Sequence, residues 1–337
     1  MNSTQDNATV VNFDSKVVDE IFEINYLSAF ILGIISNTLL IYLILRRSPA
    51  NLRPYCPILL ITAFTDGFAI LMFGLGQMDM RMIDYIGLFQ LNGPVKYLPE
   101  LGQCIALAFV LFSLDLEVLI LLLENWFRYR FVKTRSAVPL KQLLCRVFII
   151  LFVCSLKLPV LVSDYVYYRK VNDDYRASWP QKNVNSYIMI IHFRINVAYQ
   201  LYGAAMIAMF SGASLLSICL AIWSVRIMKK ELTNMSKKTK DLLSQFTRTI
   251  VLRLILFEIT NVLPIFINQI AWYLAINATN INIASLLLHV WLPTINCIFS
   301  IGFIKAFRQT VFQSLRASSR LLNSQPQSFV TRVHSLS

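Results

Sequence analysis

The chain has 337 residues, of which 56% are hydrophobic and 15% charged, and its mean hydropathy is +0.59. Soluble domains are normally about 45–50% apolar and about 25% charged, so this apolar excess is too large for one globular core. The composition indicates a membrane protein and excludes disordered, collagen-like and disulfide-rich secreted chains. The net charge of +13 therefore has to be considered first as a topology signal.

Seven apolar segments are long enough to be membrane spans, because one crossing needs about 20 apolar residues in a helix. The sequence predicts them at residues 24–45, 57–78, 101–123, 147–163, 199–225, 249–275 and 281–304. The last two belong to a run of 46 residues without Asp, Glu, Lys or Arg, which the polar break at 277–280 divides. We therefore expect an all-α membrane protein with a seven-transmembrane helix bundle.

The basic residues predict the orientation of this bundle. With the N-terminus outside and the C-terminus in the cytoplasm, the cytoplasmic segments hold 21 Lys and Arg residues and the outer segments hold 7. Lys and Arg near span ends mark the cytoplasmic face. The membrane topology thus explains the net charge of +13. We expect the lipid bilayer as a partner and no nucleic acid.

The predicted organisation has three parts. Residues 1–22 form an extracellular segment without the basic and apolar regions of a cleavable signal peptide, and Asn2 and Asn7 are glycosylation acceptors in it. The bundle covers residues 23–304. Residues 305–337 form a basic, Ser-rich cytoplasmic tail, for which we expect partial disorder.

Motifs of membrane-embedded chemistry are missing from the sequence. It has no Gly-x-Ser-x-Gly, no His-Glu-x-x-His and no Walker sequence, and its three histidines and six cysteines show no metal-binding spacing. We expect no enzyme, no cofactor and no metal site.

Several motifs resemble those of nematode serpentine seven-transmembrane chemoreceptors of the Str superfamily, most closely serpentine receptor class delta (Srd). The clearest is residues 35–66, with Asn37, the Leu-Arg-Pro-Tyr loop and Asp66; looser ones are Gly93-Pro94, Phe127-Arg128-Tyr129-Arg130, Leu263-Pro264 and Leu292-Pro293 with Asn296. The likeness covers about residues 25–310. The chain departs from the pattern at Val95, which leaves Cys104 without an evident partner, and at Thr260, Cys297 and Phe307.

The resemblance implies a chemosensory, olfactory-type G-protein-coupled receptor in the plasma membrane of a sensory-neuron cilium. Its partners would be a small-molecule odorant or pheromone and a heterotrimeric G protein. The alternative is a ligand-gated channel subunit or a transporter. A ligand-evoked current that survives G-protein blockade would favour the channel.

Ionisable residues inside a bilayer normally face the bundle, because exposing them to lipid costs several kcal/mol. Asp115 and Glu117 lie about 200° apart on one helix, so they cannot share a partner. Either one of them extends toward the membrane surface or is protonated while the other pairs locally, or one of them pairs with Arg253 and holds the resting state. Pro159, Pro264 and Pro293 provide kinks at which the spans can hinge.

Three further polar residues are isolated within apolar stretches, namely Asn37, Asp66 and Asn296. They either bond to their own backbones or share hydrogen bonds across three neighbouring helices as a switch. At the exit of the third span, Arg128, Tyr129 and Arg130 would face a G protein.

Candidate ligand contacts lie in the outer halves of the fourth to seventh spans. They are Lys157, Asn196, Tyr199, Gln200, Asn268, Gln269, Trp272 and His289. Aromatic residues at this level are often interfacial anchors, but amides on neighbouring helices need partners in hydrocarbon. Lys157 either extends to the outer headgroups or points inward, toward Glu258 or an anionic ligand.

Overall fold

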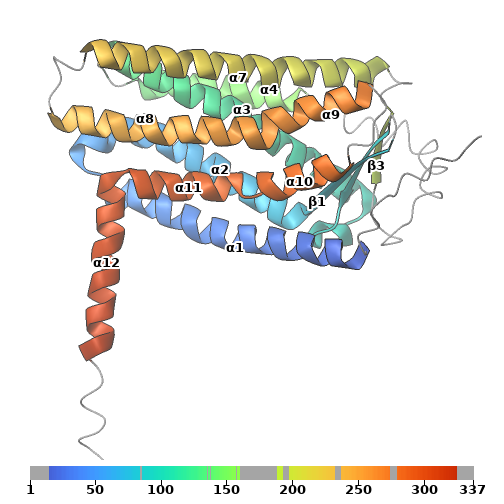
Figure 1. Ribbon diagram of the computed structural model, residues 1–337, viewed down its shortest axis with the longest axis horizontal. Coiled ribbons are helices and arrows are strands. Elements are labelled where there is room, and N and C mark those ends of the chain that lie inside the picture. The colour runs from blue at the N-terminus through green and yellow to red at the C-terminus, as the bar shows by residue number, and fades with distance from the viewer. Residues whose placement is uncertain are drawn as a thin grey trace, which may run out of the picture.

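The computed structural model describes residues 15–83, 86–134, 136, 138–156, 158–159, 188–192, 197–231, 237–273 and 279–324. Long helices run side by side in a bundle, with a small sheet at one end and a single helix, α12, at the other (Figure 1). The bundle agrees with the expected seven-transmembrane fold.

Within the described residues, seven helical segments make up the bundle. The first five are α1 (Ser15–Arg46), α2 (Cys56–Gly76), α3 (Glu100–Thr134), α4 (Leu140–Ser155) and α7 (Val197–Glu231). The sixth consists of α8 (Lys237–Phe257), the π-helical η4 (Glu258–Val262) and α9 (Leu263–Tyr273), and the seventh of α10 (Thr279–His289) and α11 (Leu292–Phe303). Within the described residues, six of these segments are long and apolar enough to cross a membrane, and α4, with 16 residues, is shorter.

Helix α3 continues well beyond the predicted end of the third span at Leu123 and ends at Thr134. No glycine or proline occurs between Gly102 and Pro139, so nothing in the sequence stops the helix earlier. The prediction ended the span at Leu123, because Glu124 follows the apolar run 118–123 and basic residues begin at Arg128. The extra turns keep Glu124 and Arg128 inside the bundle.

Two prolines coincide with irregular turns in the last two segments, as their lack of an N–H predicts. Pro264 follows the π-helical turn Glu258–Val262. The carbonyl of Thr260, four residues before that proline, accepts a hydrogen bond of 3.2 Å from Ser285 Oγ of α10. In the seventh segment the helix is interrupted by a turn between His289 and Leu292, just before Pro293.

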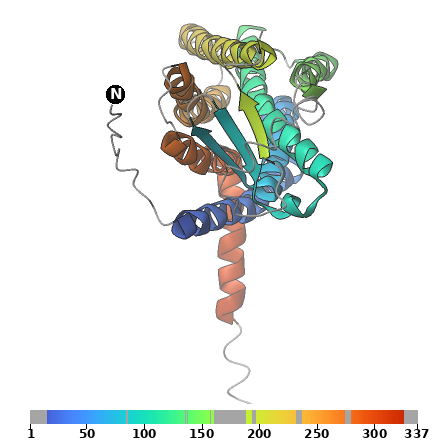
Figure 2. The ribbon, with the colours of Figure 1, turned by 90° about the vertical axis from the view of Figure 1, so that its right-hand side faces the viewer.

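The sheet is an element that the sequence did not predict. It has three antiparallel strands in the order β1 (Met78–Ile83), β2 (Ile86–Leu91) and β3 (Ile188–His192), and it covers one end of the bundle (Figure 2). The Tyr26 hydroxyl of α1 donates a 2.7 Å hydrogen bond to the carbonyl of Met78. This contact fixes the start of the sheet to the first helix.

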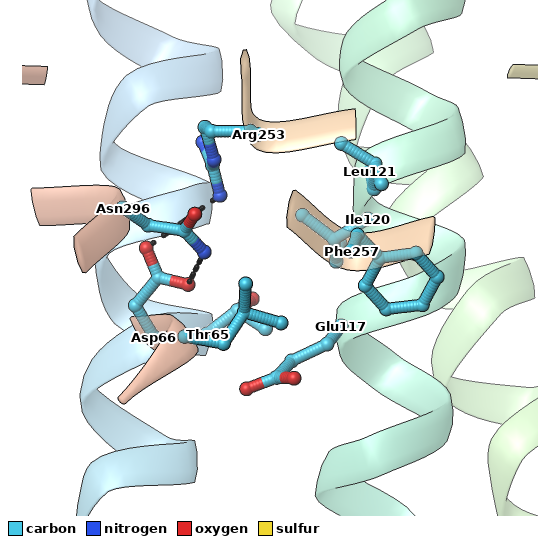
Figure 3. A pocket seen from close by; sticks show the side chains of 9 residues that line it. Thr65, Asp66, Glu117, Ile120, Leu121, Arg253, Phe257 and Asn296 are labelled. Atoms are coloured by element: carbon cyan, nitrogen blue, oxygen red, sulfur yellow. Dashed lines mark hydrogen bonds and ion pairs between the residues drawn. The ribbon is translucent and has the colours of Figure 1, made fainter. Parts of the chain in front are cut away.

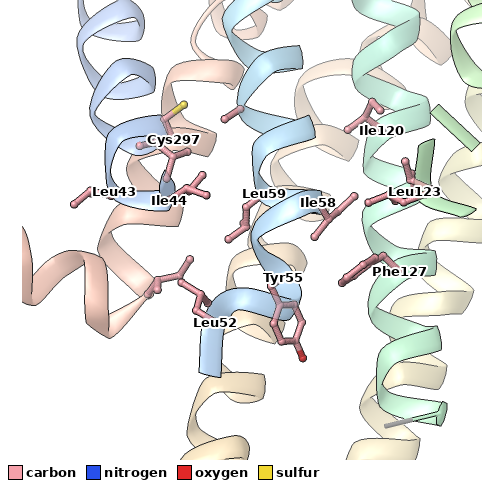
Figure 4. Close-up of a cluster of buried hydrophobic side chains, with 14 of the residues drawn as sticks. Leu43, Ile44, Leu52, Tyr55, Ile58, Leu59, Ile120, Leu123, Phe127 and Cys297 are labelled. Carbon is pink, nitrogen blue, oxygen red and sulfur yellow. The ribbon is translucent and has the colours of Figure 1, made fainter. Parts of the chain in front are cut away.

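Apolar side chains fill the bundle in two main layers. One core lies next to the sheet and is called the outer core, after the side that charge predicts to be extracellular; it includes Tyr26, Phe73, Met78, Leu107 and Met189. The inner core, at the opposite end and named for the side that charge predicts to be cytoplasmic, joins α1, α2, α3, α11 and the short 3-10 helix η1 (Ala50–Tyr55). Its members include Leu43, Ile44, Leu52, Tyr55, Ile58, Leu59, Phe127 and Cys297 (Figure 4). Polar side chains are concentrated between these layers.

Within the predicted tail, residues Lys305–Ser324 form the helix α12, and residues 325–337 lie outside the described residues, so the expected partial disorder stays a prediction. Ile304 adopts an extended conformation and ends α11, so that α12 leaves the bundle at a steep angle (Figure 1). Phe307 is fully buried in the inner core, whereas Arg308 is exposed. One face of the helix thus anchors it to the bundle.

Candidate functional site

A single guanidinium lies at the centre of the buried polar region. Arg253 of α8 donates a 2.8 Å hydrogen bond from Nη1 to Glu124 Oε1 of α3, and its Nη2 lies 3.7 Å from Asp66 Oδ2 of α2. The Thr62 hydroxyl donates to the same Glu124 oxygen. All four residues are at most 6% exposed, so this interaction joins three helices away from water.

The seventh segment contributes to the same region through Asn296 of α11. Its Nδ2 donates a 3.3 Å hydrogen bond to Asp66 Oδ1, so Asp66 contacts both Asn296 and Arg253 (Figure 3). We call Thr62, Asp66, Glu124, Arg253 and Asn296 the Arg253 cluster. It links α2, α3, α8 and α11.

Asn37 brings the first helix next to this cluster. Its Oδ1 accepts a 3.4 Å contact from Cys297 Sγ, the residue after Asn296. A Cβ added at Gly67 would lie 2.4 Å from Asn37 Nδ2, so the missing side chain lets α1 approach α2 beside Asp66. The structure thus brings together the three polar residues that the sequence singled out.

Glu117 faces the Arg253 cluster across a cavity of about 10 Å³, roughly the volume that one water molecule needs. Its carboxylate lies 3.4 Å from His289 Nε2, and the His289 ring packs edge-on against Phe73 at 4.9 Å between centroids. Glu117 and His289 are both buried. In Figure 3 the Glu117 carboxylate points into the space opposite Asp66.

This arrangement places one guanidinium among three carboxyl groups, those of Asp66, Glu117 and Glu124. A buried carboxylate without a partner is costly, so any change that moves Arg253 must supply another partner for the acids that it leaves. Such a cluster can exchange partners between discrete packings of the helices. It is suited to a conformational switch.

The predicted pairing of Arg253 with Asp115 or Glu117 needs correction. Its ion-pair partners are Glu124 and Asp66. Glu124 lies seven residues, two helical turns, after Glu117, so the two acids share one face of α3 at different depths. Asp115 is buried too, but it is not among the residues that line the small cavity.

At the inner end of α3 the three predicted G-protein contacts have different environments. Arg128 is 1% exposed and its Nη2 donates a 2.6 Å hydrogen bond to Thr247 Oγ1 of α8. The expectation that it faces a partner therefore does not hold in this conformation. Tyr129 and Arg130 are partly exposed, and the Tyr129 ring lies against Trp223 at 6.1 Å.

For most of the predicted ligand contacts the structure does not describe the side chain. Lys157 and Asn196 are outside the described residues, and for Tyr199, Gln200, Asn268, Gln269 and Trp272 only the backbone in α7 and α9 is described. His289 is the exception. It lies beneath the sheet-covered end, because α10 packs against β1. The predicted glycosylation acceptors Asn2 and Asn7 also lie outside the described residues.

Sequence reasoning missed Glu124, Thr62 and the burial of Arg128. Glu124 was assigned to a loop because it follows an apolar run, although no helix breaker follows it before Pro139. Its spacing of seven from Glu117 was a usable signal, since it puts both acids on one helix face. Nothing in the sequence marks Thr62.

The comparison with known families gives one match. The model of the family described as serpentine type 7TM GPCR chemoreceptor Srd matches residues 22–313, which include the seven helical segments and the Arg253 cluster. A search of curated proteins gives no match. The family match covers most of the chain and agrees with the multi-pass helical fold. The chain belongs to the Srd family of serpentine seven-transmembrane chemoreceptors.

Proposed function

We propose that this chemoreceptor binds a small molecule, an odorant or pheromone, in the outer half of the bundle and signals to a heterotrimeric G protein. The Arg253 cluster is the observation that carries the proposal. It connects α2, α3, α8 and α11, and it would couple a ligand site at the predicted outer end to the basic loops at the predicted cytoplasmic end. The plasma membrane of a sensory cilium is the proposed location.

The outer site would use the polar side chains of the fourth to seventh segments. We propose Lys157, Asn196, Tyr199, Gln200, Asn268, Gln269, Trp272 and His289 as its contacts. An apolar pocket with a few placed polar groups is the usual form of a small-molecule site. His289 would transmit ligand binding to the Arg253 cluster, because its Nε2 lies 3.4 Å from the carboxylate of Glu117, which faces that cluster.

The switch would work by partner exchange. In the resting state Glu124 and Asp66 hold Arg253, and therefore α8, against α2 and α3. A ligand that shifts His289 and Glu117 would stabilise a packing in which Arg253 leaves Glu124. Movement of α8 would also release Arg128 from Thr247 and free it, with Tyr129 and Arg130, to contact the G protein.

A screen of small volatiles and secreted metabolites tests this function. Cells that express the chain with a promiscuous G protein and a calcium reporter should respond to a ligand, and the response should be lost under G-protein blockade. A ligand-evoked current that persists under the blockade would instead show a channel and contradict the proposal.

Lys157 provides a test of ligand class. If its ammonium points into the bundle, it binds an acidic ligand. Lys157→Met should then reach the cell surface normally and abolish responses to acidic ligands, while responses to neutral ligands persist. Equal responses of the variant to both classes would place Lys157 at the membrane surface instead.

A further inference from the structure

A second cavity lies on the flank of the bundle, away from the Arg253 cluster. It is a groove of about 500 Å³ between α3, α4 and α7. Its lining residues are Leu119, Leu122, Leu123 and Trp126 of α3, Arg146, Ile149 and Ile150 of α4, and Leu216, Cys219, Leu220 and Trp223 of α7. Figure 2 shows α4 (green) and α7 (yellow) at the edge of the bundle.

The groove is lined almost entirely by apolar and aromatic side chains, and Arg146, the one charged residue among its described lining residues, marks its polar end. Helix α4 runs in the direction opposite to α3 and α7, and on all three helices the polar end is the end nearer the cytoplasmic loops predicted from charge. Arg146, Trp126 and Trp223 lie at this end, whereas Leu119 and Leu216 lie two turns deeper on their helices. An apolar groove with one cation at its end has the chemistry to hold a lipid of one leaflet, with the acyl chains along the groove and the headgroup at Arg146.

Arg146 is the cation at the polar end. Its guanidinium carbon lies 3.7 Å from the centre of the Trp126 ring, and Arg130 approaches the same ring at 5.8 Å. Arg146 Nε is buried and makes no hydrogen bond to the described residues. No carboxylate is among the described residues that line the groove.

The depth of Arg146 suits a headgroup contact. It follows the start of α4 at Leu140 by six residues, about 9 Å along the helix. A long basic side chain at that depth reaches the headgroup level, and tryptophans such as Trp126 and Trp223 favour the same level. Leu216, Trp223 and Ile149 are more than half exposed, so the groove is open to acyl chains.

We propose that this groove, the α3–α4–α7 groove, binds one phospholipid with an anionic headgroup from the cytoplasmic leaflet. Arg146 contacts the headgroup phosphate, and the acyl chains lie along Leu119, Ile150 and Leu216. The commitment to an anionic lipid rests on charge complementarity, because the described polar end offers guanidinium and indole groups and no acid. Basic pockets between helices on the cytoplasmic side bind such headgroups.

Tryptophan fluorescence tests the site directly, because Trp126 and Trp223 line it. The full chain is reconstituted in phosphatidylcholine vesicles with a minor fraction of phosphatidylserine, and dibrominated acyl chains, which quench nearby tryptophans, are placed on one lipid or the other. The ratio of the two quenching constants gives the preference for the anionic lipid. The experiment needs neither a ligand nor a G protein, so its outcome is independent of the proposed function.

We expect a preference of about fivefold for phosphatidylserine in the wild type, which corresponds to the attraction of about one basic side chain. Arg146→Gln should reduce the ratio to about one, and Arg146→Lys should retain most of it. The matched control is Lys141→Gln, an exposed residue of α4 that does not line the groove and should leave the ratio unchanged.

Cys219→Phe tests the shape of the groove without changing its charge. The larger side chain fills the space between α4 and α7, so the preference should fall although Arg146 is intact. This variant also covers the case in which Arg146→Gln fails to fold, which size-exclusion chromatography would reveal. Equal quenching by both lipids in the wild type, or a preference that survives both Arg146→Gln and Cys219→Phe, would overturn the proposal.

Discussion

The sheet-covered end of this receptor, which charge predicts to be the outer end, and its polar middle are stabilised in different ways. The outer end is held by close apolar packing around Phe73 and Met78 and by the β1–β2–β3 sheet. The middle depends on Arg253 and its two carboxylate partners. Close packing has one good arrangement, whereas a guanidinium among several acids can change partner. We therefore expect the outer end to keep one packing, and the middle to adopt two arrangements that differ in the partner of Arg253.

The largest effect should come from removing the cation of the middle. Arg253→Met leaves Asp66 and Glu124 buried without their partner, which costs about 3–5 kcal/mol in comparable pairs. Thermal unfolding of the purified variant in detergent should show a large loss of stability. The exposed Arg46→Met is the control and should change stability by less than about 0.5 kcal/mol.

A double variant sharpens this test. Glu124→Gln removes one of the acids that Arg253→Met leaves unpaired, so the two changes together should cost less than the sum of the single changes. Strict additivity would show that Glu124 and Arg253 do not interact in the folded receptor.

An intermediate effect is expected at the outer end from overpacking. A Cβ added at Gly93 would lie 2.3 Å from the carbonyl oxygen of Leu75, and backbone cannot move away as a side chain can. Gly93→Ala should cost about 1–3 kcal/mol, with basal signalling unchanged. In Gly212→Ala, where nothing lies within 4 Å of the new Cβ, no such loss should appear. A raised basal signal in Gly93→Ala would show that the outer end takes part in the switch.

The smallest effect concerns the contact between α1 and the sheet. Tyr26→Phe removes the 2.7 Å hydrogen bond to the Met78 carbonyl and leaves that acceptor buried. The expected loss is about 1–3 kcal/mol, toward the lower end because the ring remains packed. Tyr42→Phe, at a tyrosine that is 47% exposed, is the matched control. Equal melting temperatures of Tyr26→Phe and the wild type would show that the bond adds nothing to the outer end.

The sequence predicted the fold and part of the site, because both follow from local patterns. Span-length apolar segments predicted the helical bundle, and the cost of polar groups in lipid identified Asp66, Arg253 and Asn296. Which of the acids pairs with Arg253 could not be predicted from these local patterns. It depends on how far α3 continues and on the relative depth of α3 and α8, which place Glu124 rather than Glu117 beside Arg253.

The outer sheet shows a second limit of sequence reasoning. Its strands have five or six residues each, and β2 pairs with β3 across about a hundred residues of chain. Such short segments between spans carry weak local signals, and a pairing between distant loops carries none. The same holds for the cavity beside Glu117, which forms where four helices meet.

The central claim is that the contact between Glu124 and Arg253 holds the resting state. Glu124→Gln keeps the shape of the side chain but removes its charge, which weakens the hydrogen bond from Arg253 by about 1.5 kcal/mol. The measurement is ligand-free nucleotide exchange on a heterotrimeric G protein by the receptor in nanodiscs, with the exposed Glu20→Gln as control. The account predicts a roughly tenfold shift toward the active state and a clear rise in basal exchange for Glu124→Gln alone. Basal exchange equal to that of the wild type, at equal amounts of folded receptor, would contradict it.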